Sequence, residues 1–205
     1  MRVKDLKPNT YYATAGGACV KTAETVERGW CRIVDKDGKT TIENRVPDGA
    51  VKPDPWKQSS SARPKGGRRQ VMASDGIRVT HFLAGRDGTP IEKTGVETVI
   101  NPREIKGTWE QYLELHGDAV KANAIRRESR QALEEKTKEL RKELRSYGLE
   151  EEDVRIHTWS EYIGPDKSAS SYHDAVDFKT CISLHIQSET AIDQYLALLE
   201  KGTTR

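Results

Sequence analysis

The feature that most constrains this chain is an unbroken run of helix-forming residues from Asp118 to Tyr147. Ala, Glu, Lys, Arg and Leu dominate the run, and it contains neither proline nor glycine before Gly148. It therefore predicts one long helix, which Gly148 ends. Its apolar residues form a narrow stripe, so one face of the helix packs against another element and the rest is solvated. The stripe consists of Ile125, Ala132, Leu133, Leu140, Leu144 and Tyr147.

A different pattern precedes the helix, namely short runs of β-forming residues separated by glycine-containing turns. The runs expected to pair as hairpins are Thr10–Ala13 with Cys19–Thr22, Trp30–Val34 with Lys39–Ile42, and Gln70–Ala73 with Ile77–Leu83. An Asp-Gly turn, present in the last two pairs, is a strong hairpin signal. Gly95–Ile100 adds a final strand with alternating side chains. Strands of this number and spacing indicate a small barrel or sandwich, and an SH3-like barrel matches the size best.

The residues after the helix predict a smaller α+β segment. Val154–Tyr162 is either a strand or a short helix, whereas Phe178–Ile186 alternates apolar and polar side chains as a half-buried strand does. Ser188 is expected to cap a last helix. The acidic run Glu150–Asp153 is expected to be the solvated start of a helix, where carboxylates are favourable.

Together these patterns predict an α+β protein: a small SH3-like β-barrel, a long charged helix and a small C-terminal α+β unit. The expected parts are residues 1–107 for the β-rich domain, 108–148 for the helix and 149–205 for the last segment. Thr108 is expected to cap the helix. Trp109 and Tyr112, one turn apart, are expected to cover the open end of the barrel rather than bind a ligand.

Composition excludes several classes of protein. Charged residues make up 32% of the chain and hydrophobic residues 35%, which supports only a modest core. No apolar run approaches the roughly 18 residues of a membrane span, and the first ten residues lack the apolar stretch of a secretory leader. Cys19, Cys31 and Cys181 are too few and too scattered for a disulfide scaffold. We therefore expect a cytoplasmic protein that makes no membrane contact.

The net charge of +2 hides an asymmetry along the chain. Residues 1–107 hold 20 basic and 13 acidic side chains, a net charge of +7, whereas residues 108–205 hold 14 and 19, a net charge of −5. Residues 47–69 are expected to form a long exposed loop, rich in Pro, Gly and Ser, whose distal end is basic. Its cations are Lys57, Arg63, Lys65, Arg68 and Arg69. Such a segment suits contact with phosphates, with Trp56 available to stack on a base, although solubilising insertions have the same composition.

The long helix carries a second set of cations. Arg126, Arg127 and Arg130 form its one locally unbalanced group, which is a second candidate for contact with nucleic acid or with an acidic protein partner. The later cations are interleaved with acids and predict a solvated, self-paired face. They are Lys136, Lys138, Arg141, Lys142 and Arg145. The thin apolar stripe also suits pairing with a second copy, which predicts a homodimer through the 118–147 helix.

No catalytic or cofactor motif is recognisable. The glycine pairs lack the spacing of a phosphate loop, and neither a nucleophile elbow nor an HExxH motif is present. Cys19 and Cys31 have no neighbouring base in the sequence, so we expect buried structural thiols. Cys181 and His185 share one face of their strand but lie ~13 Å apart, too far to bind one metal ion. We therefore expect no catalytic residue, no metal and no cofactor.

Two segments carry a resemblance to a group of known proteins. They are Val3–Tyr12 (VKDLKPNTYY) and the join formed by Asn101–Ile105 (NPREI) and Trp109–Tyr112 (WEQY). Over residues 1–130 the chain resembles small actinobacteriophage-encoded proteins of unassigned function with an SH3-like N-terminal region. The resemblance implies a phage origin and action in the cytoplasm of a bacterial host, and it supplies no catalytic residue.

These observations favour a non-enzymatic, phage-encoded protein that contacts nucleic acid through a basic loop on a small β-barrel. The alternative is a protein–protein interaction module that acts on a bacterial host factor without nucleic acid. A third hypothesis is an enzyme whose site is assembled from residues distant in the sequence. Because one fold serves many functions, the surface must discriminate: an exposed apolar patch favours a protein partner.

Overall fold

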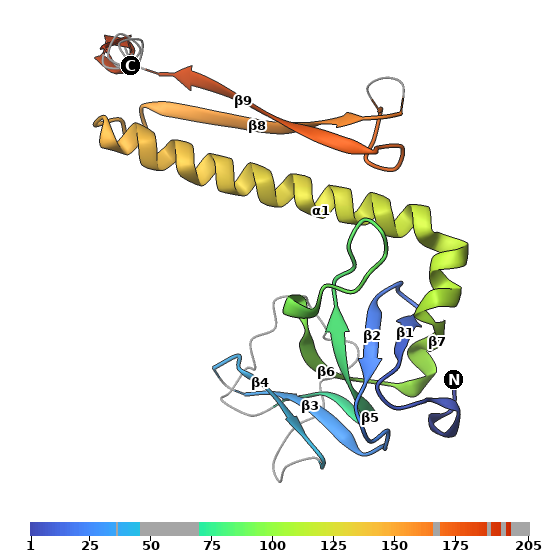
Figure 1. Cartoon of the computed structure of the whole chain (residues 1–205). Coiled ribbons are helices and arrows are strands. Elements are labelled where there is room, and N and C mark those ends of the chain that lie inside the picture. The colour runs from blue at the N-terminus through green and yellow to red at the C-terminus, as the bar shows by residue number, and fades with distance from the viewer. Residues whose placement is uncertain (36, 46–69, 166–168, 188–189, 194–195, 198–205) are drawn as a thin grey trace, which may run out of the picture. The chain divides into compact units, whose positions relative to one another are not determined.

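The structure is a computed structural model, and it describes residues 1–35, 37–45, 70–165, 169–187, 190–193 and 196–197. The chain divides into two compact units, Met1–Gly117 and Asp118–Arg205. The first contains a seven-stranded, mostly antiparallel sheet, and the second contains most of a long helix and a two-stranded sheet (Figure 1). The expected α+β class is therefore confirmed. None of the helices in the described part of the chain has the length and apolar character needed to cross a membrane.

The first unit places its strands in the order β4-β3-β5-β2-β1-β7, and β6 pairs with β5 off this path. The sheet is open, with β4 and β7 at the ends of the order. Its elements are η1 (Val3–Asp5), β1 (Tyr11–Thr14), β2 (Cys19–Thr22), β3 (Trp30–Val34), β4 (Thr40–Glu43), β5 (Gln70–Phe82), η2 (Glu92–Thr94), β6 (Val96–Ile100), η3 (Pro102–Glu104) and β7 (Ile105–Thr108).

Two of the three expected hairpins are confirmed. The strands β1 and β2 pair across the turn that contains Gly17, and β3 and β4 pair across the turn that contains Gly38. Both glycines have positive φ, +76° and +81°, the region that side chains with a Cβ rarely adopt. The turn chemistry read from the sequence was therefore sufficient at these two places.

The third expected hairpin, around Asp75-Gly76, is wrong. Residues 70–82 form one continuous strand, β5, because the two halves pair with different neighbours: the first with β3 and the second with β2 and β6. A tight type I′ turn needs positive φ at both central residues, and here only Asp75 has it (φ 54°). Gly76 is needed for another reason, since a Cβ there would lie 2.5 Å from Val99 and 2.6 Å from the carbonyl oxygen of Ile100. The Asp-Gly pair thus marks an irregularity where β5 changes partners.

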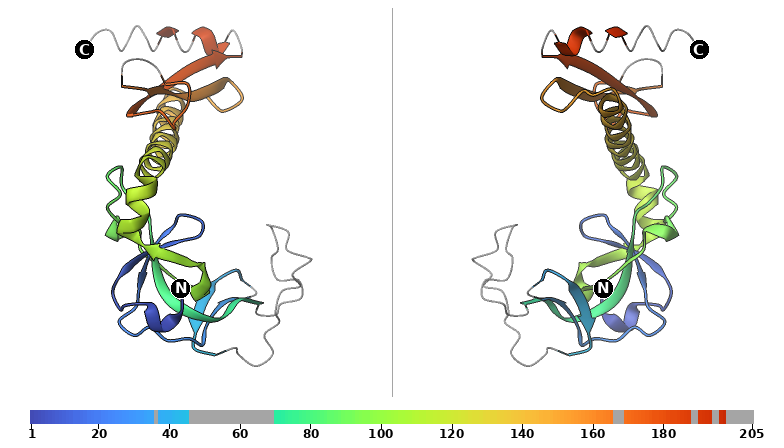
Figure 2. Two further views of the ribbon diagram at one scale, coloured as in Figure 1. Left: turned by 90° about the vertical axis from the view of Figure 1, so that its right-hand side faces the viewer. Right: turned by 90° about the vertical axis from the view of Figure 1, so that its left-hand side faces the viewer.

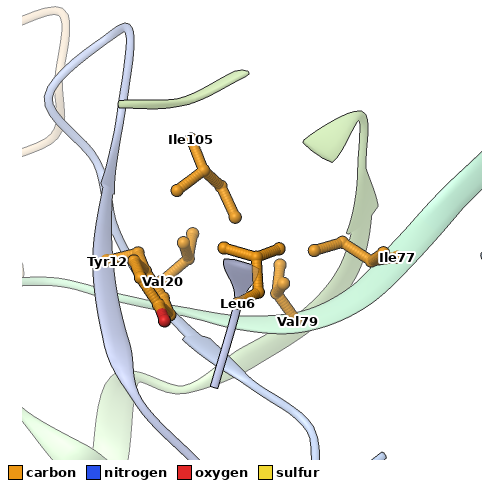
Figure 3. Packing of buried hydrophobic residues seen from close by; sticks show 6 residues of the cluster. All are labelled: Leu6, Tyr12, Val20, Ile77, Val79 and Ile105. Carbon is orange, nitrogen blue, oxygen red and sulfur yellow. The ribbon is translucent and has the colours of Figure 1, made fainter. Parts of the chain in front are cut away.

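The core of the first unit is made of side chains that these strands turn inward (Figure 3). Its fully buried members are Leu6, Tyr12, Val20, Ile77, Val79 and Ile105. Tyr12 satisfies its polar end within this core, because its hydroxyl accepts a 2.8 Å hydrogen bond from the backbone N–H of Lys7. The segments that meet here are far apart in sequence, so the core joins the first and last strands of the unit.

The helix α1 (Trp109–Ser146) begins in the first unit and continues into the second. Thr108 caps it as expected: its hydroxyl accepts from the N–H of Gln111, whose side chain accepts in return from the N–H of Thr108. Trp109 is buried and donates from Nε1 to the carbonyl oxygen of Gly88 at 2.8 Å, and it stacks on Tyr112. The helix is kinked at His116, next to Gly117, where a φ of −136° is non-helical.

Gly148 ends α1 as predicted, with a recognisable hydrogen-bond pattern. The N–H of Leu149 donates to the carbonyl oxygen of Leu144 at 3.1 Å, and the N–H of Gly148 donates to that of Arg145 at 3.0 Å. This is a Schellman motif, with Gly148 at positive φ (+79°). Leu144 and Leu149 also pack together in the apolar cluster of the unit, as the motif favours.

The second unit is a two-layer arrangement in which an antiparallel hairpin, β8 (Val154–Ile163) and β9 (Asp177–Ile186), packs on α1. The hairpin lies on one side of the helix in both views of Figure 2. Val154–Ile163 is therefore a strand, and the alternation predicted for residues 178–186 is confirmed. The expected helix start at Glu150–Asp153 is wrong: these residues form the turn into β8, where the carboxylate of Asp153 accepts from the N–H of Glu150. Ser188 lies outside the described residues.

Candidate functional site: a cationic groove on the second unit

The principal expected site, the basic end of residues 47–69, lies outside the described residues. This holds for all five of its cations, Lys57, Arg63, Lys65, Arg68 and Arg69, and for Trp56. Their contact with nucleic acid stays a prediction. The structure bears only on the second expected set, the cations of α1.

Arg126, Arg127 and Arg130 do not act as one patch. The guanidinium of Arg126 lies 4.8 Å from the ring centre of Tyr172 and donates to its hydroxyl at 3.3 Å. Arg127 is half-buried, whereas Arg130 is exposed and lines a groove along α1. Only Arg130 of the three is therefore joined to a larger cationic surface.

That groove lies between one face of α1 and the strand β8, and its volume is about 750 Å³. We call it the cationic groove. Its lining residues are Arg130, Leu133, Glu134, Thr137, Lys138, Arg141, Lys142 and Arg145 from α1, with Glu151 and Thr158. The helical members recur at intervals of three and four residues, so they form one stripe on the helix surface.

The charges of α1 are segregated by this stripe. Between residues 130 and 145 the helix carries six cations and four acids. The groove takes five of the cations and only one of the acids, Glu134. Lys136 and the other three acids, Glu135, Glu139 and Glu143, lie outside it. The interleaved sequence therefore does not give a self-paired face, as had been expected, but a helix with a basic side and an acidic side.

Within the groove only part of the positive charge is neutralised. Glu151 lies 2.9 Å from a guanidinium nitrogen of Arg145 and 3.9 Å from Nε of Arg141. Among the described residues, Arg130, Lys138 and Lys142 have no ion pair. Lys138 and Lys142 are four residues apart, a spacing at which like charges repel and destabilise a helix. An anion bound in the groove would relieve this repulsion.

The groove continues toward the start of the hairpin. A second hollow of about 270 Å³ shares Arg141, Arg145 and Glu151 with it, and adds Arg155 and His157 of β8. Leu133, Thr137 and Thr158 contribute uncharged surface between the cations. This is an elongated, mostly cationic surface on rigid elements, which suits a chain of phosphates better than a single small anion.

The cysteines and possible metal ligands can be located only in the described part of the chain. Burial raises the pKa of the Cys19 thiol to about 12, so this cysteine is protonated at neutral pH. Cys181 and His185 sit opposite Trp159 and Arg155 on the hairpin. Within the described residues, no three His, Cys, Asp or Glu side chains gather where they could hold a metal ion.

The cations of α1 were identified from the sequence, but their grouping on one side of the helix was not. A projection of residues 130–145 at 100° per residue is the signal that finds this arrangement, because it separates the five groove cations from all acids but Glu134. What no projection supplies is the second wall, since β8 is about 20 residues further along the chain and its position depends on the turn at Glu150–Asp153.

Comparison of the chain with protein-family models, with curated proteins and with solved structures found no match. The function must therefore be argued from the surface itself.

Proposed function

We propose that this chain is a non-enzymatic nucleic-acid-binding protein whose cationic groove holds the phosphate backbone. The observation that carries the proposal is the charge segregation of α1, which directs five cations and one acid into a single groove. Phosphate contacts dominate the affinity of proteins for nucleic acids and need no base-specific geometry. The basic residues at 57–69 are the second proposed contact, in the part of the chain whose net charge is positive.

The proposal also includes the fold relationship of the first unit and the cellular location of the chain. The sheet of the first unit is proposed to be a relative of the SH3-like barrel, opened between β4 and β7. The resemblance to actinobacteriophage proteins supports the further proposal that the chain acts in a bacterial cytoplasm, where nucleic acid is abundant and thiols stay reduced.

The test is titration of the protein with fluorescent double-stranded DNA, single-stranded DNA and RNA at ~50 and ~200 mM salt. The groove variant is Arg130→Gln, Lys138→Gln and Lys142→Gln, because these three cations are exposed and have no ion pair among the described residues, so we expect the variant to fold as the wild type does. We expect weaker binding to all three nucleic acids, and a slope of log affinity against log salt that falls by about 2 to 3.

The matched control removes the same charge elsewhere: Lys4→Gln, Lys93→Gln and Lys136→Gln, all at exposed positions outside the groove. A smaller change in slope is expected for this control. A separate variant with alanine at the five loop cations reports the contribution of the loop. If the groove variant and the control lose affinity equally, the groove has no specific role. If the wild-type protein binds none of the three probes at low salt, the proposed function is wrong.

A further inference from the structure

The hairpin of the second unit has a second face, whose side chains alternate along the strands with those that pack on α1; at one end of it, Arg155 and His157 also border the smaller hollow beside α1. Residues directly opposite each other in an antiparallel pair share a face, so this outward face consists of five cross-strand pairs. They are Arg155 with His185, His157 with Ser183, Trp159 with Cys181, Glu161 with Lys179, and Ile163 with Asp177. Nine of these ten side chains are exposed, and Cys181 is half-buried. The opposite face of the hairpin, by contrast, packs on Leu140 and Leu144 of α1.

The outward face has the composition of an interface. Trp159 stands at its centre with 44% of its surface exposed, and Ile163 is 42% exposed. Tryptophan is enriched in the energetically dominant centres of protein–protein interfaces, and polar residues are typical of their rims. Polar and charged pairs flank Trp159 on both sides along the strands. A partner that covers this face therefore removes a large apolar side chain from water.

The charges of the face show which partner fits. One end carries Arg155, His157 and His185, and the other carries Glu161 and Asp177, with Lys179 beside Glu161. A polyanion meets acids at the second end, so a nucleic acid does not match the whole face. A second copy of the same face, turned end to end, matches it. We propose that two copies of this chain associate through the outward faces of their β8–β9 hairpins.

The geometry of the pairing follows from the register. The pair Trp159–Cys181 is the middle of the five. A two-fold axis that runs between the two faces, perpendicular to the strands and through this pair, therefore places the basic end of one copy against the acidic end of the other. It sets His157 against the partner's Glu161, and His185 against the partner's Asp177, while Trp159 meets the partner's Trp159. A two-fold axis along the strands instead brings the two basic ends together, and charge repulsion disfavours it.

The size of the face sets the strength of the association. Ten residues at ~3.3 Å each and two strands that each occupy ~4.8 Å of width give a face on the order of 300 Å² per copy. This is below the roughly 800 Å² per partner of a standard stable complex. The dimer is therefore weak and depends on concentration. Leu140 and Leu144, two of the six stripe residues considered for a dimer through α1, already pack against the hairpin of their own chain, so the outward face offers a second copy a surface that the chain itself does not cover.

The experiment is sedimentation velocity of the full chain, without nucleic acid, from low micromolar to several hundred micromolar concentration. The informative variants are Glu161→Lys and His157→Glu. His157→Glu sets two carboxylates against each other across the two-fold axis, and Glu161→Lys replaces the acceptor that faces the partner's His157 with a cation; each should shift the dimer dissociation constant upward at least tenfold. An equal mixture of the two restores both contacts in a mixed dimer, so it should associate more tightly than either variant alone. His157 and Glu161 are ~13 Å apart within one strand, so this rescue cannot arise inside a monomer.

A second measurement locates the axis. Sheets that pack face to face lie ~10 Å apart, too far for a direct disulfide between the two copies of Cys181 but within reach of a short bis-maleimide. Cys19 and Cys31 are buried, so the reagent should link Cys181 to the partner's Cys181. Trp159→Ser should abolish the linked dimer, whereas the control Glu139→Lys, on the exposed acidic side of α1, should leave it intact.

The outcomes are decisive in both directions. Association that Trp159→Ser abolishes and that the mixed variants restore establishes the hairpin interface. A chain that remains monomeric at every concentration overturns the proposal, as does a dimer that Glu139→Lys disrupts and Glu161→Lys does not. Because no nucleic acid is present, neither result depends on the function proposed for the cationic groove.

Discussion

The two units of this chain differ in how they bury apolar side chains. The first unit gathers six side chains, each at most 6% exposed, from strands at both ends of its sequence. In the second unit, the cluster between the helix and the hairpin contains four buried side chains, Leu144, Leu149, Val154 and Ala191, with half-buried neighbours. A sheet of seven strands encloses a core, whereas a helix on a hairpin leaves one face of each layer in solvent. The comparison shows why the second unit has the more informative surface: its exposed faces are large, and their charges are sorted.

The largest expected difference concerns the two cores. Ile77→Ala, at a position with no exposed surface, should lower the free energy of unfolding of the first unit by about 4 kcal/mol, and Leu144→Ala should cost the second about 2 kcal/mol. The thinner core collapses more easily around the lost methyl groups. Urea unfolding monitored by tryptophan fluorescence measures both, with Trp159→Phe to assign the signal of the second unit. Equal costs would show that the two cores are packed equally well.

The two units also differ in the stability cost expected when a glycine is replaced by alanine. Gly76→Ala in the first unit should cost about 2 to 3 kcal/mol, because the new Cβ would lie 2.5 Å from Val99 and 2.6 Å from the backbone of Ile100. Gly148→Ala in the second should cost about 1 kcal/mol, from positive φ alone, because nothing lies within 4 Å. Chemical denaturation of each variant gives the values. A neutral Gly76→Ala would mean that β6 moves away at no cost.

The smallest expected effect is a decrease in the free energy of unfolding of the first unit at alkaline pH. Burial raises the pKa of Cys19 to about 12 from an ordinary value of 9.0, so the unfolded state loses this proton first. The stability due to this group is full below pH 9 and is lost as the pH rises toward 12. Unfolding measured at a series of pH values in this window should show a smaller decline for Cys19→Ala than for the wild type. The remaining decline includes Tyr11, whose pKa is also raised to about 12 by burial and by its hydrogen bond to Glu92. An unchanged pH profile in Cys19→Ala would exclude the thiol as a cause.

Local sequence signals predicted much of the fold where one interaction dominates. Gly148 ended α1, Thr108 began it, and the turns at Gly17 and Gly38 formed hairpins, since each depends on a few neighbouring residues. The hairpin predicted at Asp75-Gly76 was wrong because that prediction, too, used only neighbouring residues. Its turn chemistry is local, but the two halves of β5 have partners elsewhere in the chain that favour a continuous strand.

The sequence by itself determined that this chain has a β-rich part, a long charged helix and a short alternating strand, because periodicity and turn residues act over a few positions. It also contained every cation of the groove. Only the tertiary structure decided what those cations do: β8 returns along one face of α1, so Arg130, Lys138 and Lys142 gain a second wall while Glu135, Glu139 and Glu143 do not. Likewise, the register of β8 with β9 set Trp159 in the middle of an exposed face. Both depend on contacts between distant residues, which a linear pattern does not specify.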